Sequence, residues 1–188
     1  MSEQARRVRG SLFVDYVRMV RGRRDIDWAP YLAEGDREII DAPIVPDNWY
    51  PMETFERLGV AILKEVALGQ VEAVRMWGRF QTDALAKFYP ELVAAGDPRD
   101  TLYRFQVLRA RLFDYDAVLL REVHDEAAQI RIAYGMGAIA EEAASMQAMG
   151  FFERLLEISG AENVFAKLTE RAWLGAPATR LELSWNVA

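Results

Sequence analysis

The sequence predicts an α+β protein: an N-terminal helical block, then a β-hairpin, a helix and a second β-hairpin, with the two hairpins forming a four-stranded antiparallel sheet. Two observations carry this prediction. Apolar residues recur with helical spacing over roughly the first two-thirds of the chain, and they alternate with a period of two in two later stretches. Antiparallel hairpins that follow a block of helices are typical of the α+β class.

The N-terminal helices are predicted in three steps. A first helix spans about residues 10–21, and the segment "DWAPYLAEG" indicates a short second helix that ends at Gly35. The next segment, "DAPIVPDNWYP", contains three prolines and must be extended or turning, because a residue that precedes proline avoids the helical region. The apolar face of the first helix consists of Leu12, Phe13, Tyr16, Val17 and Val20.

Three further elements complete the helical block. Periodic apolar residues predict helices over 52–68 and 70–89, which Gly69 separates. The segment "AAGDPRD" breaks the chain again, and either Asp97 or Asp100 can cap a helix over about 99–113.

The two hairpins flank one long helix. "AVLLREVH" and "AQIRIAY" alternate around "DEAA", and "NVFAKLTERAW" and "TRLELSW" alternate around "LGAPA". Residues 138–158 between them return to helical spacing and stop at Ser159-Gly160.

Length and composition define the class of protein. The 188 residues, about half of them apolar, fit a single domain 1–188: a flexible basic arm (1–9), a mainly helical part (10–113) and a sheet with a helix (114–188). The absence of cysteine excludes disulfides, thiolate catalysis and cysteine-held zinc or iron–sulfur clusters. The chain begins with no signal-type apolar run and contains no apolar stretch of transmembrane length, so we expect a cytoplasmic protein without a membrane partner.

Charge is distributed unevenly along the chain. Residues 1–24 carry seven arginines against Glu3 and Asp15, which gives +5, so with a net charge of −6 the remainder must sum to −11. Such a basic segment can contact an acidic partner, the protein's own acidic body or a second copy. No recognition motif accompanies the charge, and nucleic-acid binding is not expected.

The single histidine, His124, is the first candidate for chemistry. It lies at a predicted strand end beside Glu122, Asp125 and Glu126. It can act as a general base or metal ligand, but adjacent strand residues point to opposite faces and hairpin turns are commonly charged because they are solvated. We therefore expect a surface histidine, no metal site and no catalytic residues.

The other polar residues that could take part in catalysis or ligand binding are also explained without a functional role. Glu141 and Glu142 diverge on a helix and are expected to be solvated, and Asp114 and Asp116 lie in a helix–strand loop. "GMGAIAEE" at 135–142 lacks the rest of any nucleotide-binding motif, so its glycines are expected to form a sharp strand-to-helix corner. No serine lies in a nucleophile-elbow sequence.

Aromatic and methionine residues are the remaining feature. Those of the central helices either pack an ordinary core or line a pocket for an apolar or aromatic ligand. If a pocket exists, we expect its lining to include Trp77, Phe80, Tyr103 and Phe113. Met146, Met149 and Phe152 in "SMQAMGFF" form a candidate dimer face.

Three segments resemble a known superfamily: "GSLFVDYV", "VRMWGRFQTDALAKFYPEL" and "GFFERLLEISGAENVFAKLTERAWLGAPATRLELSW". The superfamily includes haem–nitric-oxide-binding (H-NOX) domains, vinyl-reductase-type small-ligand domains and TRAPP-like subunits, and the likeness is greatest to a myxobacterial paralogous family of about this length. The resemblance spans nearly the whole chain in element order. It implies a small α+β module that senses a small molecule or mediates assembly, often as a dimer.

The same resemblance bears on cofactors. H-NOX domains carry a proximal histidine in a helix that corresponds by element order to "TLYRFQVLRARLF", where Phe113 occupies the approximate ligand position and His124 comes later. Their Tyr-x-Ser-x-Arg motif, which holds the haem propionates, has no counterpart in "YGMGAIAEE". The vinyl-reductase-type domains often carry cysteines around the last hairpin, where this chain has Trp173 and Gly175.

We therefore expect a cofactor-free, non-enzymatic, cytoplasmic module for ligand sensing or protein interaction in signalling, present as a homodimer. The ligand would be small and apolar or aromatic. The alternatives are a homodimeric scaffold with no ligand and a haem-based gas sensor that uses His124.

Overall fold

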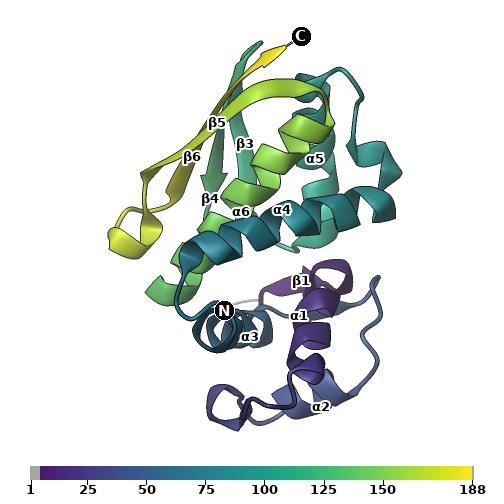
Figure 1. Cartoon of the computed structure of the whole chain (residues 1–188), viewed down its shortest axis with the longest axis vertical. Helices are drawn as coiled ribbons and strands as arrows, with labels where there is room; N and C mark the ends of the chain where they lie inside the picture. Colours follow the sequence, from purple (N-terminus) through teal and green to yellow (C-terminus); the bar gives the residue numbers. More distant parts are fainter. Residues whose placement is uncertain (1–4, 188) are drawn as a thin grey trace.

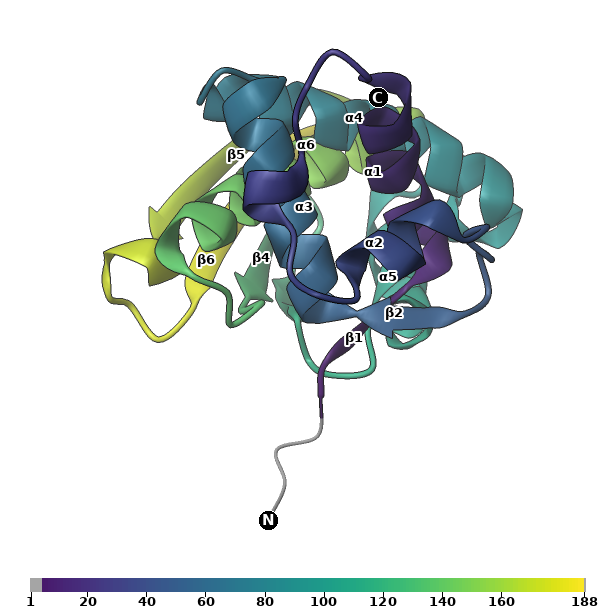
Figure 2. The same ribbon diagram turned by 90° about the horizontal axis from the view of Figure 1, so that it is seen from below.

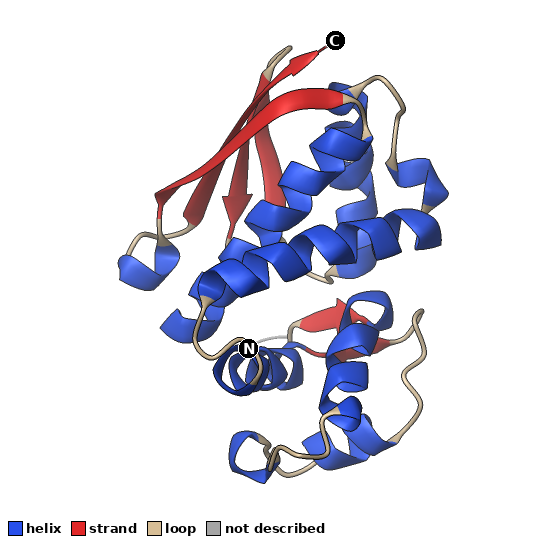
Figure 3. Ribbon diagram, in the orientation of Figure 1, coloured by secondary structure: helices blue, strands red, loops and turns tan. Residues whose placement is uncertain are grey.

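The computed structural model describes residues 5–187 and has the predicted order of a helical block, a hairpin, a helix and a hairpin (Figures 1 and 3). The helices are α1 (Gly10–Gly22), α2 (Asp36–Asp41), α3 (Met52–Glu65), α4 (Val71–Phe88), α5 (Pro98–Leu112) and α6 (Ala138–Ile158). The strands are β1 (Arg7–Arg9), β2 (Trp49–Pro51), β3 (Val118–Val123), β4 (Ala127–Ile132), β5 (Ala161–Glu170) and β6 (Thr179–Val187). Short 3-10 turns lie at Ala29–Tyr31, Pro90–Leu92 and Ala172–Leu174.

The four-stranded antiparallel sheet is confirmed. Its strand order is β3-β4-β6-β5, so the two hairpins meet along β4 and β6, where Ile130 lies opposite Leu181. The inner side chains of β4 and β6 are buried and those of β3 and β5 are buried or half-buried, whereas several outer ones, such as Phe165 and Arg180, are exposed. One face of the sheet therefore packs on the core and the other faces solvent.

Helix α6 lies between the sheet and α4 in Figure 1, and its bounds match the predicted range 138–158. Helices α4 and α6 cross at unusually close range. A Cβ built on Gly150 would lie 1.9 Å from the carbonyl oxygen of Arg75, and one on Gly78 would lie 2.0 Å from that of Gln147. Only glycine allows this approach.

Polar side chains complete the contact between α4 and α6. The Thr82 hydroxyl donates to the Phe151 carbonyl oxygen at 3.0 Å. Arg75 forms an ion pair with the buried Glu153, and Arg79 forms one with Glu157 at 2.7 Å. The two helices thus form a closely packed unit, which we call the α4–α6 pair.

The N-terminal helices differ from the prediction in one place. "DWAPYLAEG" contains only the 3-10 turn Ala29–Tyr31, and α2 begins after Gly35 instead of ending there. Pro30 lies at the start of the short turn, and Gly35 has a φ of 90°, a left-handed conformation that interrupts any helix across it. The buried carboxylate of Asp36 then joins α2 to α3 by accepting hydrogen bonds from Thr54 and Arg57.

The predicted arm 1–9, which was expected to be flexible, is bound to the rest of the chain where the structure describes it, from residue 5 onward. Strand β1 pairs with β2, Val8 bridges to Phe113, and the Arg7 side chain binds Asp114 at 2.7 Å. The Arg6 guanidinium donates to the carbonyl oxygens of Tyr134 and Gly135. The basic segment therefore joins the N-terminal helices to the residues that flank the first hairpin, and Figure 2 shows β1 beside β2 from below.

Other local predictions are confirmed. Asp97, one of the two candidate caps, accepts a hydrogen bond from the backbone N–H of Asp100 and starts α5. Gly135 has a φ of +69° at the corner between β4 and α6, whereas Gly137 is extended and needs no special conformation. No helix in residues 5–187 has the length and apolar character that a membrane span requires.

Candidate functional site

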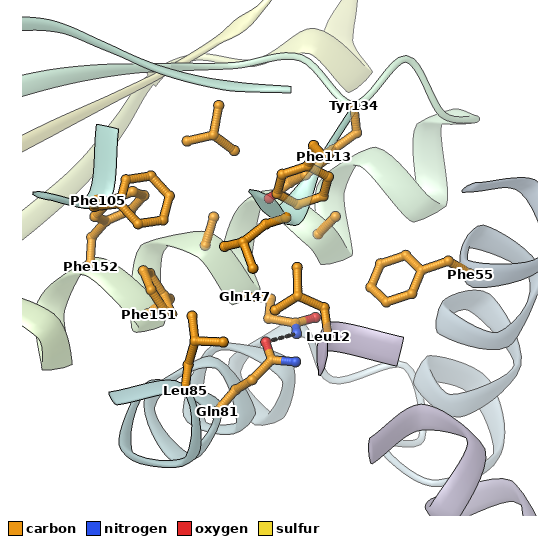
Figure 4. A pocket seen from close by; sticks show the side chains of 14 residues that line it. Leu12, Phe55, Gln81, Leu85, Phe105, Phe113, Tyr134, Gln147, Phe151 and Phe152 are labelled. Atoms are coloured by element: carbon orange, nitrogen blue, oxygen red, sulfur yellow. Dashed lines mark hydrogen bonds between the residues drawn. The ribbon is translucent and has the colours of Figure 1, made fainter. Parts of the chain in front are cut away.

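Two neighbouring cavities lie where α1 and α3 meet the α4–α6 pair; we call this boundary the seam. The larger cavity, about 160 Å³, lies among α1, α3, α4 and α6 and is bordered by Tyr16, Phe55 and Trp77. The smaller cavity, about 60 Å³, extends toward α5 and β3 and is shown in Figure 4. Phe55, Ala144 and Gln147 line both.

A row of hydrogen-bonded polar side chains separates the cavities. The Tyr16 hydroxyl donates to Gln147 Oε1 at 2.5 Å, and Gln147 Nε2 donates to Gln81 Oε1 at 2.7 Å. All three side chains are buried. The row ends at Gln81 Nε2, a buried donor that has no partner in the described part of the chain.

A second donor lines the smaller cavity from the opposite side. Tyr134 is buried, and Figure 4 shows its hydroxyl directed inward past Phe113. Burial raises the pKa of Tyr134 and of Tyr16 above the ordinary value for a phenol, so both hydroxyls stay protonated and can donate hydrogen bonds. The rest of the smaller cavity's lining is apolar, mainly the rings of Phe55, Phe105, Phe151 and Phe152 with aliphatic side chains.

The four side chains that were predicted to line one pocket do not come together. Phe113 lines the smaller cavity and Trp77 the larger one. Phe80 is 73% exposed and Tyr103 is 47% exposed, so neither lines either cavity. The face of α4 that packs on α6 carries Gly78 and Thr82 instead, because the close helix crossing requires small side chains.

The predicted dimer face is wrong for two of its three residues. Phe152 is 1% exposed and Met149 is 8% exposed, and both belong to the hydrophobic core. Met146 is partly buried against the same core. Because α6 is covered by α4 on one side and by the sheet on another, the side chains of Met149 and Phe152 are not available to a second copy.

His124 is a surface residue, as expected. It follows the end of β3, its side chain is 72% exposed, and its Nε2 lies 4.0 Å from a Glu122 carboxylate oxygen. Its backbone N–H donates to the Ala127 carbonyl oxygen and closes the hairpin turn. Among residues 5–187, no group of three or more acidic or histidine side chains is arranged to hold a metal ion.

Glu141 departs from the predicted solvated acidic pair. It is 3% exposed, and its two carboxylate oxygens accept the backbone N–H groups of Tyr134 and Met136. Glu141 thus fixes the corner between β4 and α6 that carries Tyr134. Gln81, Gln147 and Tyr16 were not anticipated as site residues, because polar side chains on an otherwise apolar helix face carry no distinctive sequence signal.

The architecture around the seam is H-NOX-like. Solved structures that share it include an H-NOX protein from S. oneidensis in its Fe(II)NO ligation state, with a TM-score of 0.61, 11% identity and coverage of 95% of this chain and 99% of that chain. An oxygen-binding H-NOX domain related to soluble guanylate cyclases matches with a TM-score of 0.61 and 13% identity over 95% of each chain. An unliganded Fe(II) H-NOX protein from K. algicida, in a mutant form, matches with a TM-score of 0.61 and 12% identity over 95% of this chain and 96% of that one.

Sequence comparison adds nothing to this fold-level likeness. No family model matches the chain, and no curated protein matches it either. The expected likeness to a myxobacterial paralogous family therefore has no support from these comparisons, whereas the H-NOX-like fold does.

The residues at the seam do not fit a histidine-ligated haem. The chain's one histidine lies on the exposed hairpin turn, and the lining of both cavities contains neither histidine nor cysteine. Phe113 contributes an apolar ring to the smaller cavity.

Proposed function

We propose that this protein is a haem-free, non-enzymatic module that senses a small molecule held at the seam. The observation that carries the proposal is the pair of cavities at the boundary between two differently packed parts of the molecule, divided by the row Tyr16–Gln147–Gln81. A ligand at this boundary contacts α1 and α3 on one side and the α4–α6 pair on the other. Its binding can therefore change how the two parts pack, which is the physical requirement for a sensor.

The size of the cavities supports the haem-free part of this proposal. They measure about 160 and 60 Å³ and are separated by hydrogen-bonded side chains, whereas pockets for drug-sized ligands and cofactors are typically ~300–1,000 Å³. A large planar cofactor would have to displace Gln147 and the rings around it.

Production of the protein in the presence of excess haem precursor tests the proposal. Protein that has been produced with added haem precursor and passed through gel filtration should contain no stoichiometric haem by absorption spectroscopy. Native mass spectrometry, compared with the denatured mass, then reports any other non-covalent ligand. Retention of one haem per chain that is lost in His124→Ala would overturn the proposal in favour of a gas sensor.

A second candidate function, protein interaction through self-association, is favoured by a different observation. Met76, Phe80 and Phe88 lie on one exposed row of α4 at four- and eight-residue spacing. This row, instead of Met149 and Phe152, would form the contact. Sedimentation of the wild-type protein and of Phe80→Glu tests it: a dimer that dissociates in the variant supports the function, and a wild-type monomer at micromolar concentration contradicts it.

A further inference from the structure

The chemistry of the smaller cavity narrows the class of ligand, and this inference rests on the proposed function. We infer that the smaller cavity binds a small neutral molecule with a carbonyl-type acceptor oxygen, such as a short-chain ketone, which accepts a hydrogen bond from Gln81 Nε2 or from the Tyr134 hydroxyl.

Hydrogen bonding gives the first restriction on the ligand. Gln81 is 8% exposed, and its Nε2 can only donate; its own oxygen already accepts from Gln147. A buried donor without a partner costs roughly 1–3 kcal/mol, so the fold gains by supplying an acceptor there. The hydroxyl of Tyr134 takes part in no hydrogen bond within residues 5–187, and as a protonated phenol it is a second donor. With two unpaired donors in its lining, the cavity favours a ligand that carries a hydrogen-bond acceptor.

Charge gives the second restriction. The fourteen side chains that line the smaller cavity include no acidic or basic group. An ion placed there would lose its hydration and gain no counter-charge, at a cost of many kcal/mol. The acceptor must therefore be an uncharged oxygen, which excludes carboxylates and phosphates.

Size gives the third restriction. A cavity needs at least ~10–15 Å³ to hold one water molecule. A cavity of about 60 Å³ therefore holds roughly four to six heavy atoms. Acetone, with its two methyl groups against the phenylalanine rings and its oxygen at one of the donors, satisfies all three restrictions.

The test uses a matched pair of probes, acetone and isobutene, which have the same shape but differ in the oxygen. Nuclear magnetic resonance of the full chain follows the side-chain amide protons of Gln81 and the neighbouring methyl groups as each probe is added. We expect both probes to shift the methyl resonances and acetone alone to shift the Gln81 amide downfield.

Variants sharpen the test. Tyr134→Phe removes a hydroxyl that has no partner in residues 5–187, so the fold should persist; it should weaken acetone binding three- to tenfold and leave isobutene binding unchanged. Tyr103→Phe removes an exposed hydroxyl and serves as the matched control, with no change for either probe.

Three results would overturn the inference. Equal responses of Gln81 to both probes, together with no effect of Tyr134→Phe, would show an apolar cavity without oxygen recognition, while the proposed sensing function would stand. Long-lived water at Gln81 and no binding of acetone would show that the cavity is a hydration site. If neither probe binds and native mass spectrometry also finds no ligand, the proposed function fails as well.

Discussion

The α4–α6 pair and the seam are adjacent, share α4 and α6, and are built in opposite ways. In the pair, glycines bring two backbones into direct contact and ion pairs flank the crossing. At the seam, large rings and a polar row leave two cavities between them. Close packing transmits any change of volume as strain, whereas incompletely filled space tolerates it. A rigid unit and an adaptable boundary are therefore built on the same two helices.

Gly150→Ala should have the largest effect. Its Cβ would lie 1.9 Å from the Arg75 carbonyl oxygen, so the helices must separate, and the free energy of unfolding should fall by about 3 kcal/mol. Chemical denaturation measures it. Gly22→Ala, where a Cβ meets nothing within 4 Å, is the control and should change stability by less than about 1 kcal/mol. Equal effects of the two substitutions would mean that the close crossing is not real.

Asp36→Asn should cost about 2 kcal/mol at neutral pH, because it breaks a buried ion pair whose Arg57 partner is a third exposed. Burial tends to raise the pKa of Asp36, but hydrogen bonds from Arg57, Thr54 and the Ala33 N–H outweigh it, and the pKa lies below its usual value. A lowered pKa stabilises the fold above the unfolded-state pKa of aspartate, and this contribution is lost as pH falls through the folded-state pKa.

The stability difference between wild type and Asp36→Asn should therefore shrink as denaturation is repeated at successively lower pH. Asp25→Asn removes an exposed ion pair with Arg23 and should leave stability unchanged. A pH-independent difference for Asp36→Asn would contradict the assigned role of the carboxylate.

Ala144→Val tests the tolerance of the seam. Ala144 lines both cavities, so the added methyl groups occupy empty space and stability should change by no more than about 1 kcal/mol. Ala61→Val is the matched control in the filled core of α3 and should lose about 1–3 kcal/mol. If Ala144→Val is the more damaging of the two, the seam is not under-packed.

His124→Ala should have the smallest effect. The imidazole is exposed on a hairpin turn whose closing hydrogen bond comes from the backbone. The free energy of unfolding, measured by thermal denaturation, should therefore change by less than about 0.5 kcal/mol. Ligand retention measured by native mass spectrometry should not change either, and its loss would place His124 in the site after all.

The sequence predicts the sheet well because apolar residues alternate along its strands, and it predicts α6 well because Gly137 and Gly160 bound a long apolar segment. The bounds of α4 agree with the prediction, but Phe80, which was expected to line a pocket, is exposed together with Met76 and Phe88. The residues that face α6 are Gly78 and Thr82. Hydrophobic periodicity identifies the buried face of a helix only where large apolar side chains fill the interface. A close helix crossing instead requires small residues, which the periodicity does not mark. Mid-helix glycines at 78 and 150 were the available signal for that crossing.

The candidate site was less predictable than the fold. Phe113 and Trp77 reach the seam, but the polar row depends on long-range contacts: Tyr16 lies 131 residues from Gln147, and Gln81 lies 66 residues from it. Periodicity and local motifs contain no information about such pairings. The prediction of the second helix was wrong for a local reason. Gly35 has a left-handed conformation and directly precedes α2, instead of ending a helix before it.

Crystallography under xenon pressure tests the central claim, that the seam holds accessible space for a ligand, most directly. Xenon enters apolar cavities of this size without a specific hydrogen bond. Xenon density is expected in both cavities, on the two sides of the row Tyr16–Gln147–Gln81, and none at the helix crossing where Gly78 and Gly150 lie. An absence of xenon from both cavities would show that the seam is closed and would contradict a ligand site there.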